Sequence, residues 1–214
     1  MLTEQEHPLT VHQRNIAMIA AYAATGDLLK LNAALQQGLV DGLTISDCRE
    51  VLVQLYAYAG FPRSLNALGE LMKVVDTRRE QGVQDTEGSL PGPLPEPDEM
   101  LVAGTQNQTT LVGRPVKGVL FDFAPVIDQY LKVHLFGDIF SRDNLDWKKR
   151  ELATVGALAA MTGVESQLEA HLGISMNVGL TYSRLEELVP LFEEKGEKSI
   201  ARRLRAALDS LRTP

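Results

Sequence analysis

The chain has few cysteines, little positive charge and no long apolar run. Its single cysteine, Cys48, excludes an intrachain disulfide and a Cys-x-x-Cys redox pair. A count of 21 Lys and Arg against 28 Asp and Glu gives a net charge of −7, which argues against a generic nucleic-acid-binding surface. The stretch IAMIAAYAA is too short to cross a membrane, and the polar, acidic N-terminus is unlike a secretory signal. We therefore expect a soluble, cytoplasmic protein that contacts neither nucleic acid nor membrane.

The sequence contains a diverged internal repeat. Residues 31–44 read LNAALQQGLVDGLT and residues 168–181 read LEAHLGISMNVGLT, at a constant spacing of 137 residues (181 − 44). The same spacing places Gly26, after IAMIAAYAAT, on Gly163, after ATVGALAAMT. The two copies differ in their polar residues, since Glu151 and His171 in the second copy correspond to Arg14 and Ala34 in the first. We infer two copies of one helical unit, which would build a site from complementary parts.

The pattern of apolar residues predicts an all-α fold. Apolar residues recur at helical spacing through both copies, and strand alternation is almost absent. The predicted N-caps are Thr10, Asp27, either Thr44 or Ser46, and Thr181. We predict a first helical repeat at 1–81, a linker and irregular segment at 82–125, and a second helical repeat at 126–214.

The predicted linker is rich in helix-breaking residues. The run GVQDTEGSLPGPLPEPD, at 82–98, has four prolines and three glycines in 17 positions. Residues 99–125 fit no clear pattern and are expected to hold short extended pieces. A helix is expected to end at Gly60, and Pro62 can open the next one.

Glu151 and His171 are the candidate catalytic residues. They lie on two successive predicted helices of the second copy. A buried histidine beside a carboxylate is a common general acid/base arrangement, because each group tunes the proton affinity of the other. The alternative is a histidine with a purely structural role in the core or at the surface.

The second copy, KRELATVGALAAMTGVESQLEAHLGISMNVGLT, resembles the carboxymuconolactone decarboxylase family. The first copy supplies a second hallmark of that family, the YAGFP stretch that begins at Tyr58. The resemblance covers about residues 11–75 and 143–208 and implies tandem helical repeats of the alkylhydroperoxidase D-like fold. It also implies a homo-oligomer, with a trimer of two-repeat chains favoured. The residues that match in the second copy are Arg150, Glu151, Leu152, His171, Asn177, Gly179 and Thr181.

The chain lacks the thiols of the related alkylhydroperoxidase D proteins. Those proteins use Cys-x-x-Cys-x-x-x-His, and the two thiol positions are Val164 and Gln167 here. Cys48 lies on a different predicted helix and has no partner thiol. A disulfide-relay peroxidase needs both a nucleophilic and a resolving thiol, so this activity is disfavoured.

The resemblance implies a cofactor-independent decarboxylase that acts on a small carboxylated lactone such as 4-carboxymuconolactone. No cofactor is expected, because the lactone ring accepts the electrons. No metal is expected either, since His134 and Asp138 lack a third nearby ligand. His171 and Glu151 would transfer the proton. Arg63 is either the residue that binds a substrate carboxylate or a surface arginine at the start of a helix. The alternative is a family member that binds a small ligand without catalysis.

Tyr58, His134 and Asn177 complete the predicted substrate-binding residues. His134 shares a predicted helical face with Asp138 and Arg142. This face is either a wall of the substrate pocket or a structural surface network.

Overall fold

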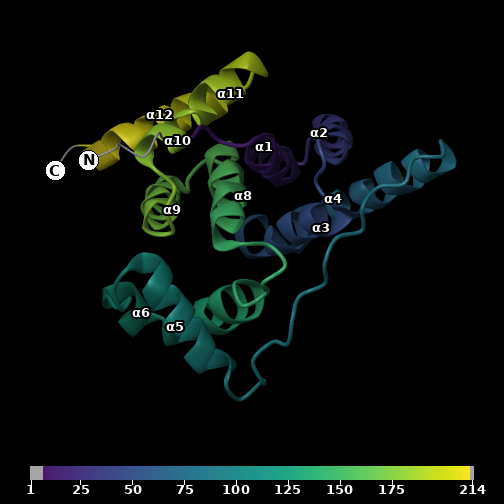
Figure 1. The fold of residues 1–214 in the computed structure, drawn as a ribbon. Coiled ribbons are helices and arrows are strands. Elements are labelled where there is room, and N and C mark those ends of the chain that lie inside the picture. The colour runs from purple at the N-terminus through teal and green to yellow at the C-terminus, as the bar shows by residue number, and fades with distance from the viewer. Residues whose placement is uncertain (1–6, 213–214) are drawn as a thin grey trace, which may run out of the picture.

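The structure is a computed structural model, and it describes residues 7–212 of the chain. These residues form helices and no strand (Figure 1), which confirms the predicted all-α fold. None of the helices in this range is both long enough and apolar enough to span a membrane.

The first half of the chain forms four helices. Side-chain oxygens of Thr10, Asp27 and Thr44 accept hydrogen bonds from the first turns of the first three, as predicted. Gly60 interrupts the fourth helix with φ 81°, ψ 161°, and this kink is the helix end predicted before Pro62. The four helices are α1 (Val11–Thr25), α2 (Leu28–Val40), α3 (Ile45–Gln54) and α4 (Tyr56–Glu80).

The second half has the same order of long helices after an inserted group. Gly163 separates α8 from α9 with φ 79°, as Gly26 separates α1 from α2 with φ 71°. These correspondences support the inferred repeat. The inserted group is α5 (Met100–Val112), α6 (Val119–Phe123), α7 (Pro125–Tyr130) and the π-helix η1 (Leu131–Ile139). It is followed by α8 (Trp147–Ala160), α9 (Glu165–Asn177), α10 (Tyr182–Glu186), α11 (Leu188–Glu194) and α12 (Lys198–Arg212).

The centre of the core is the crossing of α1 and α8. Both helices are buried on all sides, at residues 15–24 of α1 and 150–160 of α8. Their small residues let the two backbones meet, because a Cβ atom placed on Gly156 would lie 2.3 Å from the carbonyl oxygen of Ala17. In Figure 1, α8 stands in the middle of the molecule with α9 to one side and α1 to the other.

The expected linker runs along the protein surface as a bonded strap, defined here as residues 83–95. The carbonyl oxygens of Thr86 and Glu87 accept hydrogen bonds from the backbone N–H groups of Ile45 and Ser46, at 2.9 and 2.8 Å. These two donors are in the first turn of α3, where no intrahelical partner exists. Farther along, the N–H of Gly92 donates to Asp143 at 2.8 Å. The strap therefore caps α3 and contacts the segment that leads into α8.

The extended pieces expected between 99 and 125 do not form. Residues 100–112 are the helix α5, which packs against η1, and residues 119–123 are the short helix α6. A Cβ atom on Gly104 would lie 1.7 Å from the carbonyl oxygen of Lys132, so only glycine permits this contact. The sequence signal was weak because α5 packs through glycine and polar side chains rather than through a regular apolar stripe.

The close α1–α8 crossing predicts that one added methyl group at Gly156 lowers the stability of the protein. We expect Gly156→Ala to lower the free energy of unfolding by about 1–3 kcal/mol, because the two backbones must separate. Gly173→Ala is the matched control, since a Cβ atom at this helical position would meet no atom within 4 Å. The control should leave stability unchanged or raise it by up to about 1 kcal/mol. Chemical unfolding of both variants measures the difference, and equal stability would contradict the close crossing.

Candidate active site

Helices α8 and α9 bring Glu151 and His171 together. Nδ1 of His171 lies 2.8 Å from Oε2 of Glu151. Glu151 is fully buried and His171 is 8% exposed, so the pair reaches the surface only through the histidine. A carboxylate that binds one ring nitrogen orients the imidazole and leaves the other nitrogen for a proton transfer.

Tyr58, on the first turn of α4, adds a third polar group to this pair. Its ring meets the His171 ring edge-on, with 5.5 Å between centroids. Its hydroxyl is buried and makes no hydrogen bond with another described residue, although the nearby Thr154 opposes the rise in its pKa. Burial and then the Glu151 carboxylate raise the pKa of Tyr58 well above that of a free phenol, so the hydroxyl keeps its proton at neutral pH.

One oxygen of the carboxylate is also without a partner. Oε1 of Glu151 is buried and accepts no hydrogen bond. Buried polar atoms are usually paired, so each exception needs an explanation. The Glu151 oxygen and the Tyr58 hydroxyl are both open to a further hydrogen bond, and unpaired buried atoms of Asn144 and Tyr182 lie outside this cluster.

Arg63 is bonded to neither Glu151 nor His171. Its side chain is exposed and packs against the turn between α1 and α2, where a Cβ atom on Gly26 would lie 1.4 Å from Nη1. It makes no hydrogen bond or ion pair with another described residue.

His134 and Asn177 are bonded to other parts of the structure. Nδ2 of Asn177 donates to the carbonyl oxygen of Leu111 at 3.0 Å, which fastens the end of α9 to α5. Nδ1 of His134 lies 3.2 Å from Asp138 on the exposed face of η1. Arg142, expected on the same face, pairs with Glu50 instead. Of the predicted site residues, the structure therefore brings together Tyr58, Glu151 and His171.

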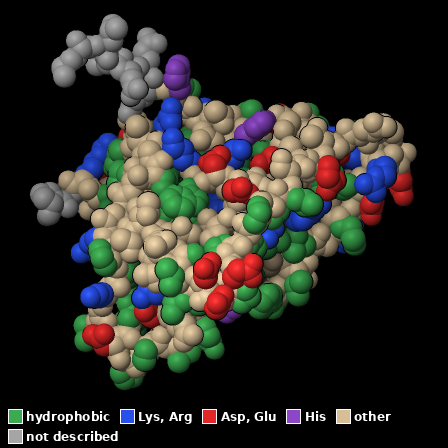
Figure 2. All heavy atoms as spheres, turned by 60° about the horizontal axis from the view of Figure 1, so that its bottom comes forward, with side chains coloured by type: hydrophobic (Ala, Val, Ile, Leu, Met, Phe, Trp, Pro, Cys, Tyr) green, Lys and Arg blue, Asp and Glu red, His purple; other side chains and the backbone are tan. Residues whose placement is uncertain are grey.

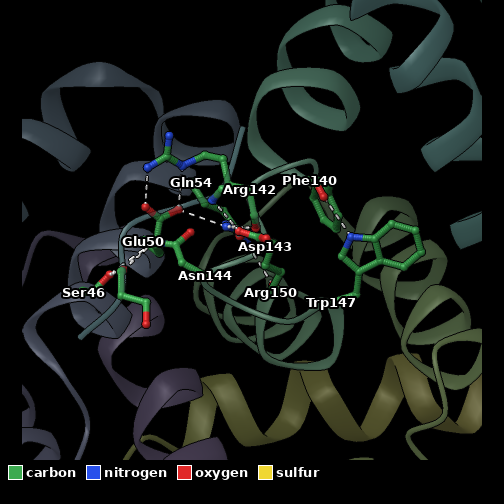
Figure 3. A network of polar contacts seen from close by, with 11 residues as sticks. Ser46, Glu50, Gln54, Phe140, Arg142, Asp143, Asn144, Trp147 and Arg150 are labelled. Carbon is green, nitrogen blue, oxygen red and sulfur yellow. Dashed lines mark hydrogen bonds and ion pairs between the residues drawn. The ribbon is translucent and has the colours of Figure 1, made fainter. Parts of the chain in front are cut away.

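A buried ion-pair network beside this cluster was not predicted from the sequence. Arg150 is fully buried, and its guanidinium donates to Glu50 at 2.9 Å, to Gln54 at 3.3 Å and to the carbonyl oxygen of Arg142 at 2.8 Å. Figure 3 shows Glu50 between the guanidinium groups of Arg142 and Arg150. A possible signal was the i, i+4 pair of Glu50 and Gln54 beside the apolar stripe of their helix.

The two arginines decide the charge state of Glu50. Burial alone would raise the pKa of this carboxyl, but hydrogen bonds from Arg142 and Arg150 outweigh it and lower the pKa to about 2. Arg142 and Trp147 also line a hollow of about 870 Å³, whose other walls are the strap and α5. This hollow is not lined by Glu151 or His171.

Cys48 lies in the apolar core, where its thiol is not reactive. It is fully buried, and burial raises the pKa of its thiol to about 12. The thiol is therefore protonated at neutral pH and is not a nucleophile. In the described range, no group of three or more His, Cys, Asp or Glu side chains is placed to hold a metal ion.

Residues 126–190 match the sequence model of the carboxymuconolactone decarboxylase family. The match runs from α7 to α11 and contains both Glu151 and His171, so the pair lies inside the segment that is similar to this family. Tyr58, Glu50 and Gln54 come from outside the matched residues. No curated protein matches the chain.

The network predicts an acid-sensitive contribution to stability. Because the pKa of Glu50 is lower in the folded than in the unfolded protein, its stabilisation is full above about pH 4.5 and is lost as the pH falls toward 2. The expected size is about 3 kcal/mol, and Glu50→Gln should cost about 3–5 kcal/mol at pH 7 because Arg150 remains buried and charged.

Unfolding in denaturant at pH 7, 4 and 3 measures this effect. The difference in the free energy of unfolding between the native protein and Glu50→Gln should become smaller as the pH falls. Glu80→Gln is the control, since Glu80 is exposed and makes no ion pair with another described residue. If this difference in unfolding free energy stays constant from pH 7 to 3, the role assigned to Glu50 is refuted.

Proposed function

We propose that the protein is a cofactor-independent carboxy-lyase that removes CO2 from a small carboxylated lactone, of which 4-carboxymuconolactone is the first candidate. The observation that supports it is the buried, hydrogen-bonded Glu151–His171 pair, with the unpaired Tyr58 hydroxyl beside it. The match of residues 126–190 to the carboxymuconolactone decarboxylase family supports this chemistry.

The proposed reaction needs a proton donor and a group that stabilises the negative charge left on the substrate. The bond between the ring carbon and the carboxylate breaks, CO2 leaves, and the bonding electrons delocalise into the lactone. His171 then gives a proton to the ring carbon, while Glu151 stabilises the charged imidazole that delivers it. The Tyr58 hydroxyl donates a hydrogen bond to the lactone oxygen on which negative charge develops.

The second carboxylate of the substrate requires a cation. Arg63 is the candidate because its guanidinium is exposed and has no competing ion pair with a described residue. A planar guanidinium binds a carboxylate through two parallel hydrogen bonds. Arg63 would have to leave its position against Gly26 to do so.

A second candidate is small-ligand binding without turnover. The limited exposure of His171 favours it, since only 8% of this residue is accessible to solvent. A peroxidase is opposed by two observations, the protonated and buried Cys48 thiol and the residues Val164 and Gln167 at the two expected thiol positions.

The decarboxylase proposal is tested by CO2 release from 4-carboxymuconolactone. His171→Ala and Glu151→Gln should each lower kcat by about 10²–10⁴-fold, because each removes part of the proton transfer. His7→Ala is the matched control, since His7 is an exposed histidine outside the cluster, and it should keep full activity. Full turnover in His171→Ala would refute the mechanism, and no turnover in the native protein would favour binding without catalysis.

We also propose that the chain is a homo-oligomer, with a trimer favoured. The support is the apolar surface of α6 and α7, which bury none of their residues. Val119 and Phe123 are 86% and 88% exposed. Figure 2 shows hydrophobic side chains gathered at the lower left of the molecule, where this part of the chain lies. Leu120, Val126, Ile127 and Tyr130 are exposed as well, and a large exposed apolar patch is typical of interaction sites.

The oligomer is tested by light scattering after size-exclusion chromatography. The double variant Phe123→Ser, Val119→Ser should contain more of the 23.5 kDa monomer than the native protein, because the substitutions remove apolar area from the interface. Leu29→Ser is the matched control, since Leu29 is 84% exposed but lies on α2. A monomeric native protein would exclude the proposed assembly.

A further inference from the structure

A hollow of about 320 Å³ lies on the first half of the chain, beside α1 and α2. We call it the α1–α2 hollow. Its apolar wall is formed by Met18, Ala33 and Ala34, and its polar wall includes Tyr22, Lys30 and Lys195. The volume is within the range of small-molecule sites.

One residue that lines the hollow is the counterpart of His171 in the repeat. Ala34 stands 137 residues before His171, and Arg14 stands 137 residues before Glu151. In the second half, the His171 side chain fills the space between its helix and α8 and bonds to Glu151. In the first half, Ala34 is too short to fill that space, and Arg14 pairs with Glu187 at 3.2 Å. Ala34, the counterpart of His171, therefore lines the hollow, whereas Arg14, the counterpart of Glu151, does not.

Tyr22 provides a hydrogen-bond donor without a partner. The residue is only 6% exposed, it lines the hollow, and its hydroxyl makes no hydrogen bond with another described residue. Burial and then the charge of Glu197 raise its pKa, although Lys30 acts in the opposite direction. The hydroxyl is therefore protonated at neutral pH and can donate.

Of the two lysines, Lys195 is the one without a compensating charge. Lys30 is held by Glu197 at 2.5 Å and by Asp27 at 3.5 Å, which neutralises it. Lys195 is exposed and makes no ion pair or hydrogen bond with another described residue. The hollow thus combines an apolar wall, one hydroxyl donor on a largely buried tyrosine and one positive charge without an ion-pair partner in the described chain.

We propose that the α1–α2 hollow is a second, non-catalytic binding site for a small carboxylate with a flat apolar body. The apolar body lies against Met18, Ala33 and Ala34. The carboxylate accepts a hydrogen bond from the Tyr22 hydroxyl and pairs with Lys195. The site contains neither His171 nor Glu151, so it does not depend on the proposed decarboxylase activity.

The test is a titration of the full-length protein with 4-fluorobenzoate, followed by ¹⁹F NMR. Tyr22→Phe and Lys195→Gln should each weaken binding at least about fivefold, since each removes one charge-assisted interaction. Lys198→Gln is the matched control, because Lys198 is an exposed lysine on α12 that does not line the hollow. It should bind the probe as the native protein does.

Two further measurements distinguish the hollow from the His171 site. His171→Ala should keep the affinity for 4-fluorobenzoate, whereas Ala34→Leu should abolish binding by filling the hollow. The neutral analogue 4-fluorobenzamide should bind at least about fivefold more weakly, because it lacks the charge that Lys195 recognises. Loss of binding in His171→Ala, unchanged binding in Tyr22→Phe, or equal affinity for the amide would overturn the proposal.

Discussion

The burial of the Arg150 guanidinium constrains the orientation of α8, and the candidate site depends on that orientation. A fully buried guanidinium requires an anion and several acceptors, which Glu50, Gln54 and the Arg142 carbonyl provide. Arg150 and Glu151 are consecutive, so their side chains leave the helix about 100° apart. Holding Arg150 toward α3 therefore directs Glu151 toward α9 and His171.

The two halves share glycine turns and helix caps but carry different polar residues. Turn glycines and threonine caps recur at matching places, while the polar residues between them have diverged. The second half contributes Glu151 and His171, and the first half contributes Tyr58 and the anion that balances Arg150. Neither half contains all of these groups, so the cluster exists only when the halves pack together.

The sequence was sufficient for the fold class, the helix caps and the approach of Glu151 to His171. These features depend on local periodicity or on neighbouring helices, which a single sequence reveals directly. The Glu50–Arg150 pair was not predictable in this way, because 100 residues separate its members. The position of Arg63 depends on a glycine turn of another helix, and α5 depends on a contact through Gly104. Such contacts between distant segments leave no periodic trace in the sequence.

The strap at residues 83–95 changes how the association of the halves depends on concentration. Two separate polypeptides with the α1–α8 contact would associate in a bimolecular reaction, whereas one continuous chain makes that reaction intramolecular. The two halves are then always present in equal amounts, at a local concentration independent of expression level. This guaranteed one-to-one ratio removes any need for either half to pair with a copy of itself. It also leaves each half free to lose residues that the other retains.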